Sequence, residues 1–416
     1  MIVPAILAAL VAAPIQDAPQ FSQPQSIVEP TRLALTPKVD GIIDTDEWDP
    51  LARSNEGETF LQWEPGKLYL AAKMPVDRDL IVSLDTRQDG WLVGKDNVEI
   101  RVRIVDGKGS VVVRTLDATQ VAGPKWIDHP AFSLSSTAMA KIDGSNVTVE
   151  ASIIDPGLAV LPTKDNEKFL VRADVVAQSS QLQEPFQPRV GALIKLAMQR
   201  ASALPAGLKW NVEESGRTLT PGNSTKIRFT FSTKDEISLK KLEIKPLGAL
   251  SERVSTLGVP FPAFDKKGRA FVDYETRTAK DAPAGYHLLN GTLTTGDGAP
   301  GVIQASYRVA PTVEFDIADN RISLKSGTTS LKIPFYVKSN TQNRLDGSCS
   351  VETPSGWEIL KGDDKGFIIY NSRAGIRRVL TVTVPAGVSG TFPIRFTATI
   401  GPNTFTETRW LTILTG

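Results

Sequence analysis

The sequence is poor in the residues that thiol and metal chemistry require. Its 416 residues include one cysteine, Cys349, and two histidines, His129 and His287. A single cysteine cannot form a disulfide within the chain, and zinc sites need several Cys or His ligands together. Cys349 lies in a strand-like segment, so we expect a small buried apolar residue. The composition argues against a disulfide-stapled fold, a catalytic thiol and a His-rich metal centre.

The chain also lacks an excess of either charge. It has 47 Lys and Arg against 46 Asp and Glu, a formal net charge of +1. No run of like charges forms a basic arm or an acidic tail. The balance gives no electrostatic reason to expect nucleic acid or an anionic membrane as a partner.

Motifs that carry catalysis are missing as well. The sequence contains no glycine-rich phosphate loop and no nucleophile elbow. Asp96 and Glu99 lie three apart on one expected strand, so their side chains project to opposite faces and make a poor acid/base pair. We therefore predict no catalytic residue.

The first residues are almost wholly apolar. Residues 1–13 are too few to span a bilayer as a helix, and they end in the small residues that a signal peptidase prefers. No Lys or Arg precedes this run, so a wrongly chosen start codon or a disordered end is the alternative reading. Residues 1–20 are interpreted as a signal peptide and tether. The expected location is secreted or extracellular, with the periplasm or the cell surface as variants, and no membrane span is expected.

Helical periodicity is nearly absent, and short alternating apolar runs recur between Gly, Pro, Asn and Asp. Residues 100–105, 226–231 and 331–337 are examples of this all-β pattern. The best helix candidate, residues 192–201, is short enough to be a strand and a linker. The length suits two to four domains.

An internal repeat covers the second half of the chain. The segment 219–229 resembles 324–334, and Pro283-Ala284-Gly285 resembles Pro385-Ala386-Gly387, about 100 residues later in each case. Together with the linkers at 203–207 and 309–312, this repeat predicts three tandem β-sandwiches. Their expected bounds are 28–200, 207–310 and 312–416.

The opening segment of the first predicted sandwich resembles a known module. Residues 39–48, 67–73 and 95–102 look like the start of a family 9 carbohydrate-binding module, and the resemblance extends over roughly residues 31–197. It implies a jelly-roll sandwich that holds the end of a sugar chain. The repeats resemble the immunoglobulin-like domains found beside sugar-binding modules in secreted glycosidases, where such domains serve as spacers or docking units.

The resemblance also implies the ligand-binding residues. Glu99 matches the carboxylate of the family and Arg114 its arginine, while Trp91 matches one stacking aromatic. The second aromatic wall would be Phe186 or Trp126, because no Trp occupies the late loop that often supplies it. A pyranose stacks its C–H groups on a π-face, and charged groups bond its hydroxyls.

A structural calcium ion is the one cofactor that the residues leave open. Carboxylates of the kind that hard cations bind occur in predicted loops, at Asp85, Asp89, Asp106 and Asp128. Ordinary turn formation explains the same aspartates. Asp96 is expected either to orient Arg101 or Arg114 or to join such a calcium site.

These features lead to one functional hypothesis and one rival. The first is a secreted, non-catalytic protein that binds an oligosaccharide or polysaccharide. It would be accessory to polysaccharide degradation, at most as a subunit in O-glycosyl hydrolysis, beside cell-surface or glycosidase partners. The rival is a structural or cell-surface assembly protein whose sugar pocket has decayed.

Overall fold

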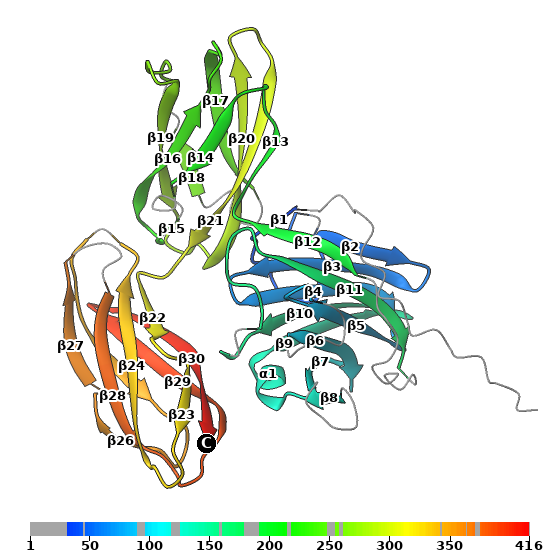
Figure 1. The fold of residues 1–416 in the computed structure, drawn as a ribbon, viewed down its shortest axis with the longest axis vertical. Helices are drawn as coiled ribbons and strands as arrows, with labels where there is room; N and C mark the ends of the chain where they lie inside the picture. Colours follow the sequence, from blue (N-terminus) through cyan, green and yellow to red (C-terminus); the bar gives the residue numbers. More distant parts are fainter. Residues whose placement is uncertain are drawn as a thin grey trace, which may run out of the picture.

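A computed structural model gives the three-dimensional structure of the chain. It describes residues 31–44, 46–89, 96–117, 125–157, 160–178, 191–213, 218–247, 254–257, 261–341, 343–362, 364–370 and 375–415. Within these residues the chain is all-β, with one short helix, α1 (Pro130–Ser135). The expected all-β tandem sandwich architecture is confirmed (Figure 1).

The first sandwich pairs a seven-stranded sheet with a five-stranded sheet. The larger sheet has the order β1 (Thr31–Leu33), β12 (Ala192–Ala197), β11 (Lys168–Ala177), β5 (Arg78–Asp85), β6 (Asn97–Val105), β7 (Lys108–Asp117) and β8 (Lys125–Asp128). The smaller sheet has the order β2 (Asp49–Ser54), β3 (Gly57–Glu64), β4 (Lys67–Pro75), β10 (Asn146–Ile154) and β9 (Thr137–Asp143). One apolar core, which includes Trp63, Val82 and Phe169, fills the space between them.

The second sandwich has a five-stranded and a four-stranded sheet. The first runs β13 (Gln199–Ala203), β21 (Pro300–Val309), β20 (Gly285–Thr295) and β17 (Leu239–Leu247), with β15 (Thr218–Leu219) also paired to β21. The second runs β14 (Lys209–Val212), β16 (Ser224–Ser232), β19 (Arg269–Thr278) and β18 (Val254–Leu257). Phe229, Tyr274 and Tyr307 belong to its core.

The third sandwich repeats this plan. One sheet runs β22 (Val313–Ile317), β24 (Ser330–Ser339), β28 (Gly375–Thr383) and β26 (Glu358–Lys361). The other runs β23 (Arg321–Leu324), β30 (Asn403–Thr415), β29 (Gly390–Ile400), β25 (Leu345–Glu352) and β27 (Asp364–Ile369). Cys349 is buried in the core between them, as expected.

The helix candidate at 192–201 is extended. Its residues enter β12 and then β13, so one nearly continuous run of chain serves the first sandwich and then the second. The repeat in the sequence corresponds to β16 and β24, each of which lies inside a four-stranded sheet of matching order. The second and third sandwiches are thus immunoglobulin-like units of one plan.

Candidate functional site

The outer face of the seven-stranded sheet is polar, although much of it is buried. In β5, Leu80, Val82 and Leu84 face the core, and the alternate positions therefore face outward. Five outward polar side chains of β5 and the adjacent β6 are 0–3% exposed. They are Asp79, Ser83, Asp85, Asn97 and Glu99. Burial of so many polar groups on one face is unusual for a sandwich surface and marks it as the candidate site.

Glu99 and Arg114 meet on this face. They are directly opposite each other in the register of β6 and β7. The Arg114 Nη2 atom donates to Glu99 Oε1 in an ion pair whose side chains are 18% and 3% exposed, respectively. The Arg114 Nε atom is buried and has no hydrogen-bond partner. The two residues that the family resemblance singled out are therefore adjacent, with one guanidinium donor unused.

Trp126 lies beside this pair on β8. It is opposite Leu116 in register, and the Arg114 guanidinium lies 5.7 Å from the centre of its ring. Only 8% of Trp126 is exposed. Trp126 thus lies on the same sheet face as Arg114, stacked against it, and does not form an opposing wall among the described residues. Trp91 and Phe186, the other two expected aromatics, lie outside the described residues.

A second charged group on the face was missed by sequence reasoning. The Arg101 Nε atom donates to Asp79 Oδ2 at 2.7 Å, and Arg103 Nη2 donates to the same oxygen at 3.1 Å. Asp79 is completely buried. The alternation of Arg101 and Arg103 on one face of β6 was visible in the sequence, but their partner on β5 was not.

The expectation that Asp96 orients Arg101 or Arg114 is wrong. Asp96 lies in the turn just before β6, and its Oδ2 accepts from the backbone N–H of Arg87 at 3.0 Å. Arg114 takes its carboxylate partner from the opposite position on β6 instead. Cross-strand register, which is not visible in local spacing, decides this pairing.

Three carboxylates gather where β5 ends and β6 begins. One carboxylate oxygen from each of Asp85, Asp89 and Asp96 lies within 4.8 Å of the other two. Burial, together with the charge of Asp96, raises the pKa of Asp89. Asp106 and Asp128 lie elsewhere, in the β6–β7 turn and opposite Arg114 on β8. Of the aspartates named from the sequence, the structure brings together these three.

The segment that carries the family resemblance has a structural role. The carboxylate of Glu150 on β10 accepts from the backbone N–H groups of Asp40 and Gly41 at 2.7 and 2.6 Å. Its other oxygen accepts from Trp48 Nε1 at 3.1 Å. Trp48 and Tyr69 are buried against each other, as core packing predicts. The segment is thereby held on the five-stranded sheet, across the sandwich from the polar face.

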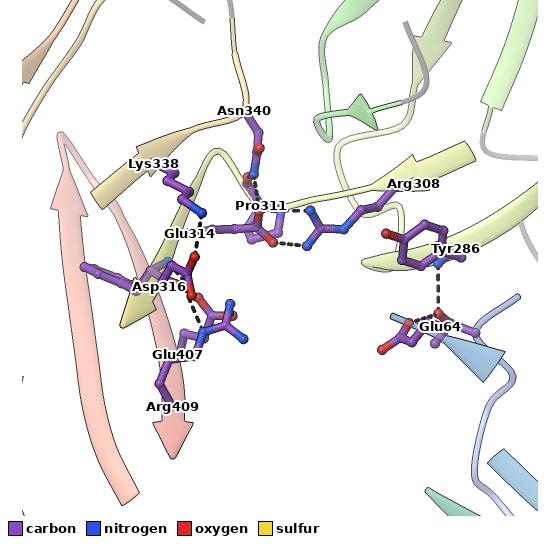
Figure 2. Close-up of polar contacts among 12 residues, drawn as sticks. Glu64, Tyr286, Arg308, Pro311, Glu314, Asp316, Lys338, Asn340, Glu407 and Arg409 are labelled. Carbon is purple, nitrogen blue, oxygen red and sulfur yellow. Dashed lines mark hydrogen bonds and ion pairs between the residues drawn. The ribbon is translucent and has the colours of Figure 1, made fainter. Parts of the chain in front are cut away.

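A cavity of about 670 Å³ lies where the three sandwiches meet. Figure 2 shows Arg308 at the end of β21 reaching Glu314 of β22, which also accepts from Asn340 Nδ2 at 2.8 Å. On the side of the first sandwich, the Tyr286 N–H donates to Thr36 Oγ1 at 2.8 Å. Thr36 in turn donates to Glu64.

The charges in this cavity are largely paired with one another. Burial raises the pKa of Glu407, which bonds Arg409 at 2.5 Å and accepts from the Phe315 N–H. Burial acts to raise the pKa of Glu64, but Lys67 at 2.5 Å and hydrogen bonds from Thr36 and Tyr69 together lower the pKa of that carboxyl. Because these groups pair with one another and join neighbouring domains, we interpret the cavity as part of the interface between the sandwiches, called the joint below.

Comparisons with known proteins show no family. No family model and no curated protein matches the chain. Similar solved structures include native Escherichia coli alpha-2-macroglobulin (8% identity, 88% of this chain, 31% of that chain, TM-score 0.24). A Salmonella alpha-2-macroglobulin variant is similar as well (10% identity, 88% of this chain, 31% of that chain, TM-score 0.25). CBD12 from CALX1.2 is another (11% identity, 47% of this chain, 83% of that chain, TM-score 0.21). The chain spans about a third of the two macroglobulins, and TM-scores this low carry no argument.

The described residues contain no helix that is long and apolar enough to cross a bilayer.

Proposed function

We propose that this protein is a secreted, non-catalytic carbohydrate-binding protein. Its ligand face is the outer face of the seven-stranded sheet around Arg114, Glu99 and Trp126. The observation that carries the proposal is the partly exposed guanidinium of Arg114, which pairs with Glu99 and lies against the ring of Trp126. The second and third sandwiches are spacers or docking units that present this face.

The chemistry of the face suits a sugar. A guanidinium donates strong charge-assisted hydrogen bonds to hydroxyl oxygens, and the ion pair with Glu99 fixes the orientation of the Arg114 side chain. Trp126 supports the guanidinium from below, which limits the rotamer freedom that binding would otherwise have to remove. Burying charged groups on a sheet face costs free energy that a solvated face would not. A role in ligand recognition explains why the protein keeps such a face.

The alternative is an assembly protein of the cell surface. One edge of the third sandwich favours it, because large apolar side chains are exposed there on β26, β27 and β28 and just beyond β27. These residues are Leu360 (55%), Ile368 (39%), Tyr370 (66%) and Val379 (39%). Both β26 and β27 are edge strands, and an apolar sheet edge is a surface on which another chain can pair.

Calorimetric titration of the full chain with a panel of oligosaccharides and soluble polysaccharides tests the proposal. We expect binding by the parent protein and a loss of about tenfold or more in affinity for Arg114→Lys, which keeps the charge but lacks the planar guanidinium and its several N–H donors. Arg395→Lys, at an exposed ion pair of the third sandwich, is the matched control and should bind like the parent.

Two results would count against the proposal. Absence of heat with every glycan from folded protein, together with concentration-dependent association in light scattering, would favour assembly. Binding that Arg114→Lys leaves unchanged would move the sugar site away from this face.

A further inference from the structure

The end of β5 and the start of β6 bring three acidic side chains to one corner of the first sandwich. Asp85 is the last residue of β5 and pairs with Asn97, the first residue of β6. Asp96 therefore lies one residue beyond the paired strands, at the same end as Asp85. With Asp89 they form the set whose carboxylate oxygens approach within 4.8 Å of one another.

Asp96 occupies this corner at an evident cost. Asp96 is only 5% exposed. Its Oδ2 atom accepts from the Arg87 N–H, but its buried Oδ1 atom has no hydrogen-bond partner. A buried carboxylate oxygen without a donor is unfavourable, and carboxylates this close repel each other. The arrangement calls for a positive charge that binds to Oδ1 and to the neighbouring oxygens.

We propose that Asp85, Asp89 and Asp96 bind a calcium ion. The ligands are hard carboxylate oxygens, which suit Ca²⁺. Zinc and copper prefer nitrogen and sulfur ligands, and the set contains neither. Asp96 lines a cavity of about 1150 Å³ between the first and third sandwiches, so water can reach the corner and complete a coordination shell of six to eight oxygens. The ion lies at the end of the strand that carries Glu99.

The consequence is a metal-dependent stability of the first sandwich. An ion held by Asp85 and Asp96 ties the last residue of β5 to the turn before β6 and removes their mutual repulsion. Because it binds the folded state through residues that converge only after folding, calcium stabilises the fold in proportion to its free concentration. This inference stands independently of sugar binding.

Titration of the full chain with CaCl₂ after chelation and dialysis tests the assignment, with thermal unfolding recorded with and without the ion. We expect a single binding site and a higher melting temperature in calcium for the parent protein. Asp96→Asn is nearly isosteric and should lose affinity by on the order of tenfold or more. Asp89→Asn, at an exposed position where folding is not at risk, should weaken binding in the same direction.

Asp106→Asn is the matched control, because Asp106 is an exposed turn aspartate of the same sandwich at positive φ, where Asn is tolerated. It should bind calcium like the parent. The proposal is overturned if the parent protein gives no calcium heat and no thermal shift. It is also overturned if Asp89→Asn and Asp96→Asn bind calcium as tightly as the parent, or if Mg²⁺ binds as well as Ca²⁺.

Discussion

A few side chains satisfy an unusual number of partners, and Glu150 is the clearest case. It is completely buried, and its two oxygens accept from two backbone N–H groups and one indole N–H. Burial raises the pKa of this carboxyl, while the N–H groups of Gly41 and Asp40 oppose that effect. Gly41, whose N–H donates to Glu150, has a φ of 84°. This left-handed backbone conformation favours glycine.

Glu150→Ala tests this role at the residue scale. The change leaves two buried donors and one partly buried donor without an acceptor, and each loss of a buried partner costs about 1–3 kcal/mol. We expect the free energy of unfolding of the first sandwich to fall by about 3 kcal/mol or more, measured by urea denaturation. Glu56→Ala, which removes an exposed ion pair with Arg78, should cost less than about 1 kcal/mol. Equal losses in the two variants would refute the explanation.

At the scale of elements, alternation along the strands places most side chains, and cross-strand pairs decide their environment. On β20 and β21, His287 and Tyr307 are directly opposite, with ring centres 5.5 Å apart. His287 is 5% exposed and its Nε2 has no partner. Burial lowers the pKa of His287 to about 4.

This strand pair predicts a pH-dependent stability. The unfolded histidine titrates near pH 6.5 and the folded one near 4, so between these values the unfolded state binds more protons. The contribution of neutral His287 is therefore complete above pH 6.5 and is lost as the pH falls toward 4, by at most about 3 kcal/mol. His287→Phe, which cannot titrate, should show a smaller loss of melting temperature over this window. Parallel pH profiles for the two proteins would contradict the prediction.

At the scale of the whole molecule, direct contacts join each pair of sandwiches. The Ser306 Oγ atom donates to Ala34 O between the first and second, and Arg308 pairs with Glu314 between the second and third (Figure 2). Thr412 Oγ1 donates to Pro156 O between the first and third. The third sandwich therefore contacts the first as well as its neighbour in the chain.

Arg308→Met tests whether this arrangement depends on the joint. Glu314 is 7% exposed, so the variant leaves a buried carboxylate with Asn340 as its remaining side-chain partner, and loss of a buried ion pair costs about 3 kcal/mol. We expect a lower melting temperature and a larger radius of gyration in small-angle scattering. Arg228→Met breaks an exposed pair with Asp273 and should leave both unchanged. An unaltered radius of gyration in Arg308→Met would show that apolar contacts suffice.

The sequence by itself determined the class of fold. Alternating apolar runs, few helical periods and a repeat of about 100 residues predicted tandem β-sandwiches. The strand-like segment around Cys349 predicted the burial of that residue. These properties are local, since a strand has a side-chain period of two wherever it pairs.

Only the tertiary structure decided which polar groups meet. The resemblance pointed to Glu99 and Arg114, but their ion pair depends on the register of β6 and β7, as the Asp79 contacts of Arg101 and Arg103 depend on β5. The carboxylate corner at Asp96 and the Glu150 contacts join residues 4 to 110 positions apart. A shift of one residue in register would turn each of these side chains to the other face, so local sequence patterns cannot specify their partners.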